Sequence, residues 1–459
     1  MPRMRNALLL IVCCRAAFAQ EAGSASTGPV EAAGQLLRFT VDPTRGAAIT
    51  NLEFVAAPHN LSSHAGLLLE GFGVASPYTP NRRVNERMRV VDGEAGPSIV
   101  YEYDGEGPNI TGLHVTRTFT FDRTRSAIAV NWRIEVKGDE AHWVAPWVRC
   151  LVAPGGTVDA LDRIDMPTTR GIVQPDSNHF APASRNWIAA TDTAAHETVF
   201  GVFDAEKLHS LEAARAIDAG ELGFGAHFVP FAMAKGDVWE TSYVIAAVRG
   251  LDHVDFATDE LAAQLDHGDG KLALLLSSTT LLPEAHTRAV VTTPDGTDAT
   301  MKVKRLVLAP DHLVRCTYEW EPAGDGLYEF LAKFETPGGT TIPHGAKTKP
   351  PHPGIDTAFI IGAAANAVLE PWSDAPHALD REGRTLKRSL AVNGPVIAWF
   401  EGPLEKLFRD DNVVATGADH PSTTSGRTAP VATSSGRTAQ VWLARNERES
   451  LQLALRLPE

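Results

Sequence analysis

Apolar and polar side chains alternate along most of residues 34–250, and this period of two constrains the fold more than any other feature of the chain. The clearest case is a pair of segments, 113–121 and 128–136, in which large apolar residues occupy every second position. Such alternation indicates β-strands with one buried face. Helix signals are few here, and the main one covers Ala205–Ile217. We therefore expect a mainly β, multi-domain chain that begins with a large sandwich of antiparallel sheets.

A second β unit is expected over residues 251–342. It opens with a short amphipathic helix in which Val254, Thr258, Leu261 and Leu265 lie on one face. Short apolar runs then follow one another at the spacing of an immunoglobulin-like β-sandwich, with glycine and proline turns between them. These runs are residues 272–278, 287–292, 302–308, 314–320 and 328–334.

Residues 343–354 are rich in proline, which cannot donate a backbone hydrogen bond to a sheet, and are predicted to form an extended linker. Beyond it, residues 355–459 are expected to be an incomplete β domain. This part contains a tandem near-repeat, Ser425–Ala429 and Ser435–Ala439, in a Ser/Thr/Gly-rich stretch. Such composition is typical of a loop insertion.

The N-terminus has the three parts of a secretory signal peptide. Two arginines precede the apolar run 7–14, and small residues then offer a cleavage point after Ala19. We therefore expect residues 1–19 to direct export, which makes the protein secreted or periplasmic. Cysteines in the run leave a lipid anchor as the alternative. No stretch reaches the ~20 apolar residues of a membrane-spanning helix, so no membrane span is expected.

Charge and cysteine content narrow the possible partners. The formal net charge of −14 opposes binding to nucleic acid, because binding to polyanions depends on clusters of Lys and Arg. Only Cys150 and Cys316 lie beyond the signal peptide, so stability must come from hydrophobic cores. Two buried thiols and one interdomain disulfide both remain open. The sequence carries no signal of oligomeric state.

Four motifs within residues 34–250 carry a family resemblance. The motifs are Arg117–Phe121, Trp143–Trp147, Ser177–Phe180 and Lys235–Trp239. In their chain order they resemble the galactose mutarotase-like supersandwich, which is found in aldose epimerases and in accessory or lyase domains that act on polysaccharides. The resemblance implies a β-supersandwich and a sugar or glycan as the partner.

Two segments near the C-terminus, Val396–Phe408 and Leu443–Gln452, carry a second resemblance. They are similar to the opening of the domain that precedes the catalytic barrel in a family of exported glycoside hydrolase-like proteins related to β-N-acetylgalactosaminidases. In that family the acidic catalytic pair lies on the barrel, which we expect to be absent from this chain. The resemblance implies polysaccharide degradation as the context and provides no catalytic residue.

His179 is the first candidate site residue. The segment Asn178-His179-Phe180 is similar to the one in which mutarotases place a histidine that contacts the substrate, and imidazole transfers protons near neutral pH. An epimerase also needs a carboxylate base, and Asp176 and Glu197 lie nearby in the sequence without matching the family's context. The alternative is an ordinary loop histidine.

Tryptophans supply the other candidates for substrate binding. Trp143 and Trp147 are four residues apart, so in an extended segment both rings project from one face, where flat sugar faces can pack. Together with Arg149 and Trp187 they are candidates to line the concave side of the sandwich. The alternative is that these aromatic side chains belong to the core.

Arginines and acidic loops give weaker signals. Arg117 and Arg185 could hold a carboxylate or sulfate of an acidic sugar, with surface ion pairs as the alternative. Asp266–Gly270 lacks the acidic spacing of a calcium loop, and the sequence has no zinc motif or phosphate-binding glycine loop. We therefore expect neither a cofactor nor a metal.

Three functions follow from these patterns. The first is a carbohydrate-binding or scaffolding region of an exported glycoside hydrolase-like protein. The second is a sugar epimerase or polysaccharide lyase that acts in the supersandwich cleft, with His179 as acid or base. The third is a cell-surface spacer that binds no sugar.

Overall fold

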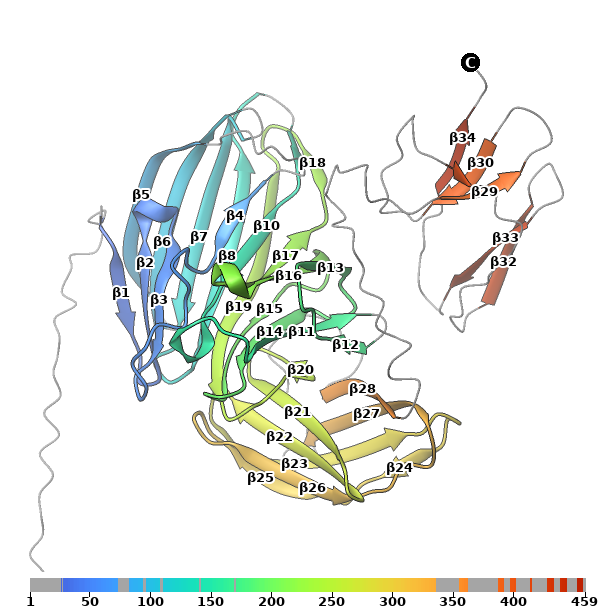
Figure 1. Ribbon diagram of the computed structural model, residues 1–459. Coiled ribbons are helices and arrows are strands. Elements are labelled where there is room, and N and C mark those ends of the chain that lie inside the picture. Colours follow the sequence, from blue (N-terminus) through green and yellow to red (C-terminus); the bar gives the residue numbers. More distant parts are fainter. Residues whose placement is uncertain are drawn as a thin grey trace, which may run out of the picture.

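The computed structural model describes residue 26, residues 28–335 with gaps, and separate strand segments between residues 355 and 456. Nearly all of the described secondary structure is β, so the prediction of a mainly β sandwich fold is confirmed (Figure 1). Within these ranges no helix has the length and apolar character needed to cross a membrane. The gaps are residues 73–81, 94–95, 108–109, 140–141 and 169–170.

The first unit begins with a three-stranded antiparallel sheet, β1-β2-β3. Its inward side chains join the main core, where the rings of Phe39 and Phe121 meet edge to face at 5.2 Å. The elements are β1 (Val30–Ala33), β2 (Leu37–Asp42), the 3₁₀ turn η1 (Pro43–Arg45) and β3 (Ala48–Phe54).

A nine-stranded antiparallel sheet, in the order β12-β11-β14-β15-β19-β8-β7-β6-β5, forms one large layer of this unit (Figure 1). In β7 every second side chain is buried, as the alternation predicts. The strands are β5 (Arg82–Gly93), β6 (Gly96–Glu106), β7 (Leu113–Phe121), β8 (Ala127–Val136), β11 (Asp162–Thr168), β12 (Gly171–Val173), β14 (Trp187–Asp192), β15 (Glu197–Val202) and β19 (Val238–Arg249).

A five-stranded sheet, β13-β16-β17-β10-β4, forms the opposing layer. Val148 and Phe224 of this sheet share one core with Val115 and Ile134 of the nine-stranded sheet. Strands β9 and β18 form a separate two-stranded ribbon. The elements are β4 (Leu69–Gly71), β9 (His142–Val144), β10 (Trp147–Leu151), η2 (Pro154–Gly156), β13 (His179–Pro182), β16 (Leu208–Ala216), η3 (Ile217–Ala219), β17 (Glu221–Phe228) and β18 (Phe231–Met233).

The second unit is a smaller sandwich of two sheets, β20-β21-β22-β26 and β24-β23-β27-β28, with β25 paired to β23. Leu274, Val291 and Phe330 from the two sheets share a core of their own. The strands are β20 (Phe256–Ala257), β21 (Leu261–Gly268), β22 (Lys271–Ser278), β23 (Leu282–Thr292), β24 (Asp298–Thr300), β25 (Lys304–Leu308), β26 (Val314–Glu319), β27 (Gly326–Glu335) and β28 (Ile355–Ile361).

Two segments expected to be helical are strands. Ala205–Ile217 contains β16, which pairs with β13 and β17, and Val254–Leu265 contains β20 and the start of β21. Residues 210–214 of β16 and 261–265 of β21 are buried at consecutive positions, so the alternation that marks a strand with one exposed side is missing in both. Strands of this kind are continuous apolar runs without alternation, and long-range pairing overrides the local helix preference.

Apolar side chains join the two units. We call residues 250–255, between β19 and β20, the connector. Trp187 and Phe200 of the nine-stranded sheet pack in one cluster with Val254 of the connector and Leu275 of β22. The cysteines take no part in this contact, since Cys150 is a buried free thiol in the first core and Cys316 is one in the second. Apolar packing therefore contributes to the contact between the units, and Cys150 and Cys316 form no disulfide across it.

The C-terminal part departs from expectation in two places. Strand β28, which we expected in the last domain, pairs with β27 of the second unit. Parts of both Ser-Gly-Arg-Thr-Ala repeats lie in the paired strands β32 and β33, so this stretch contains a hairpin rather than only a loop. The expected signal peptide and the linker 343–354 lie outside the described residues. The last strands are β29 (Lys387–Ala391), β30 (Ile397–Glu401), β31 (Val413–Val414), β32 (Arg427–Ala432), β33 (Thr438–Leu443) and β34 (Gln452–Arg456).

Candidate functional site

Polar and aromatic side chains gather on the side of the five-stranded sheet that is turned away from the core, which we call the outer face. In β10, Val148 and Cys150 belong to the core, so strand alternation directs Trp147 and Arg149 to the outer face. The register then sets their neighbours, because Trp147 pairs with His227 of β17. The outer face therefore carries an arginine, an indole and an imidazole side by side.

Strand β16 adds a carboxylate to this group. Gly225 of β17 pairs with Arg149 on one side and with Glu212 on the other, and Phe180 of β13 pairs with Glu212 in turn. Residues that pair across strands share a face, so all of these side chains point outward. We define the outer-face cluster as Trp147, Arg149, Phe180, Glu212 and His227.

Glu212 is at the centre of the cluster. Arg149 Nη2 donates a hydrogen bond to Glu212 Oε1, and His227 Nε2 lies 3.0 Å from Glu212 Oε2. Burial alone would raise the pKa of Glu212, but the hydrogen bond with His227 and the charge of Arg149 outweigh burial and lower that pKa. Glu212 is therefore an ionised carboxylate at neutral pH, held between a cation and an imidazole.

Two glycines make room for these side chains. A Cβ atom on Gly225 would lie 2.8 Å from the carbonyl oxygen of Val148 and 3.2 Å from Glu212 Oε2. A Cβ atom on Gly71 of β4 would overlap the indole of Trp147. Glycine at these two positions lets the carboxylate and the indole lie close to the backbone of the sheet.

Aromatic rings flank His227. The centroid of its ring lies 5.5 Å from that of Phe180 and 6.4 Å from that of Trp147, and the Arg149 guanidinium lies 5.8 Å over the indole. Trp147, Arg149 and Phe180 are partly exposed. The face thus offers flat apolar surface beside charged hydrogen-bonding groups, and its imidazole–carboxylate pair can accept or donate a proton.

The predicted residues Trp143, Trp147 and Arg149 lie on one continuous run of chain that forms β9 and β10. Trp143 is on β9 and is 63% exposed, whereas Val144 beside it is in the core. The expectation that Trp143 and Trp147 project from one face therefore agrees with these positions, and Arg149 lies on the same side of β10. That these residues line a concave sugar site stays a prediction.

His179 and Asn178 occupy different positions from those expected. His179 pairs with Ala213, a core residue, so its side chain is on the core side of β13, where burial lowers its pKa. The residue that β13 contributes to the outer face is Phe180. Asn178 accepts a hydrogen bond from the backbone N–H of Arg215 at 2.8 Å, which fixes the turn before β13.

The expectation that Trp187 and Arg117 contact a sugar is wrong. Trp187 is buried in the apolar cluster between the two units, where a ligand cannot reach it. Arg117 is fully buried and donates hydrogen bonds to the carbonyl oxygens of Leu68, Gly46 and Ala47, so it binds the protein's own backbone. Tryptophan and arginine suit sugar binding chemically, but these two side chains are buried and serve the core instead.

The remaining candidates lie outside the cluster. Glu197 belongs to the nine-stranded sheet, where its Oε2 atom lies 2.6 Å from His59 Nε2. Asp176 and Arg185 are exposed, and Arg185 donates to the carbonyl oxygen of Ser184. Neither Asp176 nor Glu197 belongs to the outer-face cluster.

Sequence reasoning missed Glu212 and His227. Glu212 lies in an alanine-rich segment that favours a helix, so its place on a strand face was hidden. His227 is in a strand whose consecutive residues are nearly all buried, which removes the alternation that marks an outward side. The glycines at 223 and 225 were the available signal, because glycine inside a strand often marks a close approach.

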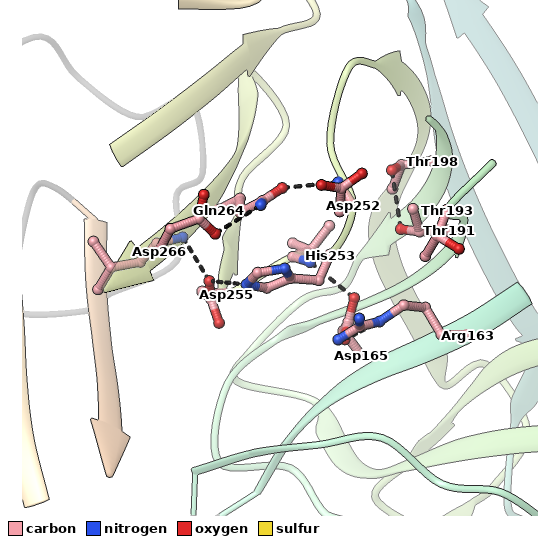
Figure 2. Close-up of polar contacts among 12 residues, drawn as sticks. Arg163, Asp165, Thr191, Thr193, Thr198, Asp252, His253, Asp255, Gln264 and Asp266 are labelled. Carbon is pink, nitrogen blue, oxygen red and sulfur yellow. Dashed lines mark hydrogen bonds and ion pairs between the residues drawn. The ribbon is translucent and has the colours of Figure 1, made fainter. Parts of the chain in front are cut away.

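A second polar cluster lies where the chain passes from the first unit to the second (Figure 2). Asp165 of β11 is fully buried. Its Oδ1 atom accepts a hydrogen bond from Arg163 Nη2 at 3.1 Å, and its Oδ2 atom accepts one from the backbone N–H of Val254 at 2.8 Å. A carboxylate of the first unit therefore holds the backbone of the connector.

The other half of this cluster holds the connector to the second unit. His253 Nε2 lies 3.0 Å from Asp255 Oδ2, and the same oxygen accepts a hydrogen bond from the backbone N–H of Leu265 at 2.6 Å. Gln264 accepts a bond from the backbone N–H of Asp252 at 2.8 Å (Figure 2). We define the interdomain joint as Arg163, Asp165, His253 and Asp255.

Burial and charge shift two groups of the joint. Burial raises the pKa of Asp165 to about 6, although the nearby charges of Arg163 and His253 oppose this effect. Burial lowers the pKa of His253, but its hydrogen bond with Asp255 and the Asp255 charge outweigh burial and raise that pKa overall. Both groups therefore hold their protons more firmly than they would in the unfolded chain.

Metal-binding groups do not assemble in the part of the chain that the structure describes. There, His, Cys, Asp and Glu side chains form no group of three or more that could hold a metal ion. Burial also raises the pKa of Cys150 to about 12, which disfavours the thiolate that metals require.

Comparison with known proteins finds structural similarity only. No family model matches the chain, and no curated protein matches it. A galactose mutarotase-like protein from Lactobacillus casei is 8% identical, with a TM-score of 0.38, over 48% of this chain and 100% of its own. An aldose epimerase homologue from C. elegans is 11% identical, with a TM-score of 0.34, over 49% of this chain and 99% of its own.

Proposed function

We propose that the outer-face cluster binds a carbohydrate. The observation that carries this proposal is the ionised Glu212, held between Arg149 and His227 and flanked by the rings of Trp147 and Phe180. Sugars present flat C–H faces that pack on aromatic rings, and hydroxyl groups that hydrogen-bond to charged side chains. Both kinds of group lie within one patch of a rigid sheet, as a sugar site requires.

The wider setting belongs to the same proposal. The protein is exported and holds glycan for a glycoside hydrolase-like enzyme that degrades polysaccharide. The signal-peptide pattern of residues 1–19 and the resemblance of Val396–Phe408 support this setting.

Calorimetric titration of the full chain with neutral, amino and acidic sugars tests the proposal. We expect at least one class to bind, and we expect Glu212→Gln to lose affinity about tenfold or more, because it removes the charge and keeps the shape. Val303→Ala, at an exposed position of the second unit, is the matched control and should bind as the parent does. Absence of binding across all classes would favour a spacer and contradict the proposal.

A sugar epimerase is the second candidate, and the 3.0 Å contact between His227 and Glu212 favours it. An imidazole paired with a carboxylate is suited to general acid–base chemistry, and here it lies on the outer face, unlike His179. Polarimetry of freshly dissolved sugars measures mutarotation directly. An enzyme would lose turnover in His227→Asn while keeping most of its sugar affinity, whereas a binding protein shows no turnover in the parent.

A further inference from the structure

Trp143 is the most exposed of the large apolar side chains among the described residues, at 63%. Single exposed apolar side chains are common on protein surfaces, so Trp143 is informative only through the groups that lie on the same side of the chain. Trp143 lies in the β9–β18 ribbon, where it pairs with Ala232. The ribbon offers no large neighbour opposite it.

The ribbon continues the two strands that carry the outer-face cluster. Trp147 of β10 pairs with His227 of β17, and Val144 of β9 pairs with Phe231 of β18. Three positions separate Trp147 from Val144, whereas four positions separate His227 from Phe231. The β17–β18 chain therefore contains one extra residue between the two pairs. On the strand side that carries Trp143, only Ala145 and Pro146 separate β9 from β10.

Alternation places Trp143 on the same side as the cluster. Val144, Val148 and Cys150 all belong to the core, so Trp143 and Trp147 both point away from it. Ala145, the residue between them on that side, has only a methyl group, and no long side chain of this strand rises between the two indoles. The Cα atoms of residues four apart on a strand are separated by ~13 Å.

We propose that the carbohydrate site extends from Trp147 along β9 to Trp143, and that its ligand is an oligosaccharide rather than a monosaccharide. The inference rests on the proposed function. A separation of ~13 Å is longer than one pyranose ring, so a single sugar cannot contact both indoles. A chain of several sugars spans it, with one ring over Trp147 beside the charged groups and another over Trp143.

The test is a chain-length series measured by calorimetry on the full protein. The probes are β-1,4-linked glucose oligomers, β-1,4-linked N-acetylglucosamine oligomers and α-1,4-linked galacturonate oligomers of increasing length, each compared with its monosaccharide. We expect affinity to rise with length, and Trp143→Ala to remove that gain, about tenfold or about 1.4 kcal/mol, without changing monosaccharide affinity. Trp143→Phe should retain most of the gain, and Leu281→Ala, at a similarly exposed position, is the control.

The outcomes separate this inference from the proposed function. Binding that is independent of length, or that is equal in the parent and Trp143→Ala, overturns the extended site and leaves the monosaccharide site intact. Absence of binding by every probe and its monosaccharide contradicts the proposed function itself. A change of oligomeric state in Trp143→Ala, with oligosaccharide affinity unchanged, assigns Trp143 to a protein contact and also overturns the inference.

Discussion

The outer-face cluster and the interdomain joint are built from the same residue types: arginine, carboxylate and histidine. In the joint, Asp165 and Asp255 also accept hydrogen bonds from the backbone N–H groups of Val254 and Leu265. In the cluster, the hydrogen bonds described for Glu212 come from side chains, and they link strands whose backbones are already paired. The joint fixes the path of the chain, whereas the cluster adds chemistry to a sheet that is already fixed.

This difference gives a criterion for polar clusters in β proteins. A carboxylate that satisfies backbone N–H groups in a buried connector is part of the fold, because its removal leaves those donors unpaired. A carboxylate bound by side chains, beside partly exposed rings, supports no backbone path and can serve a ligand. The comparison predicts that variants of the joint change stability, and that variants of the cluster change binding.

Asp165→Ala is expected to have the largest effect. It leaves the N–H of Val254 and the guanidinium of Arg163 without their acceptor in a buried place, which lowers the free energy of unfolding by about 3 kcal/mol. Urea unfolding followed by tryptophan fluorescence measures this loss. Asp165→Asn keeps an acceptor for Val254 and should lose less. A loss below about 0.5 kcal/mol in the alanine variant would contradict the claim that the interdomain joint stabilises the fold.

Gly71→Ala tests the cluster by crowding it. The new methyl group overlaps the indole of Trp147, and overpacking of this kind costs about 2 kcal/mol. Because the indole must move, sugar affinity should fall in the same variant. Gly324→Ala, where a Cβ meets nothing within 4 Å, is the control for thermal unfolding and titration. Unchanged affinity in Gly71→Ala would mean that the position of Trp147 does not matter for binding.

The joint should make stability depend on pH. The pKa of Asp165 is raised to about 6 in the folded protein, so its contribution is fully present near pH 4 and is lost as the pH rises through 6. The raised pKa of His253 acts in the same direction, with its loss at higher pH. We expect the free energy of unfolding to fall by roughly 1–2 kcal/mol between pH 5 and 8 from these groups.

Urea unfolding at a series of pH values checks this prediction. The double variant Asp165→Asn, His253→Gln should be less dependent on pH than the parent over that interval, whereas Glu212→Gln should keep the parent's slope. An equal slope in the parent and the double variant would show that the joint does not titrate as described.

Arg149→Lys is expected to have the smallest effect on stability. The Arg149 side chain is 30% exposed and lysine retains a cation beside the buried Glu212, so the free energy of unfolding should change by less than about 1 kcal/mol. Lysine keeps the charge but loses the planar guanidinium over Trp147, so sugar affinity should still fall. Thermal unfolding and calorimetry on one preparation measure both quantities. A large loss of stability with unchanged affinity would mean that the outer-face cluster, like the interdomain joint, stabilises the fold and does not bind a ligand.

Local pattern predicted the parts of the fold whose strands have one buried face. Segments 113–121 and 128–136 alternate strictly, and they are β7 and a strand within one residue of β8. Pattern failed at β16 and β21, because consecutive buried residues remove the alternation there and alanine favours a helix. In those strands only pairing with distant segments decides the structure.

The candidate site was predictable only in part, for the same reason. Trp147 and Arg149 are adjacent in one strand, and their shared side follows from a period of two. Their partners Glu212 and His227 meet them through the register between distant strands, which no local pattern specifies. His179 was expected to face a ligand because its neighbours form a motif, but register directs it to the core.

Hydrogen exchange with and without a bound oligosaccharide tests the central claim most directly, because it compares the two clusters in one experiment. The account predicts slower exchange of backbone amides in β10, β16 and β17 when sugar is present, and unchanged exchange in residues 252–255 of the connector. Protection confined to the connector or to the second unit, with none in these strands, would contradict the assignment of the outer face as the carbohydrate site.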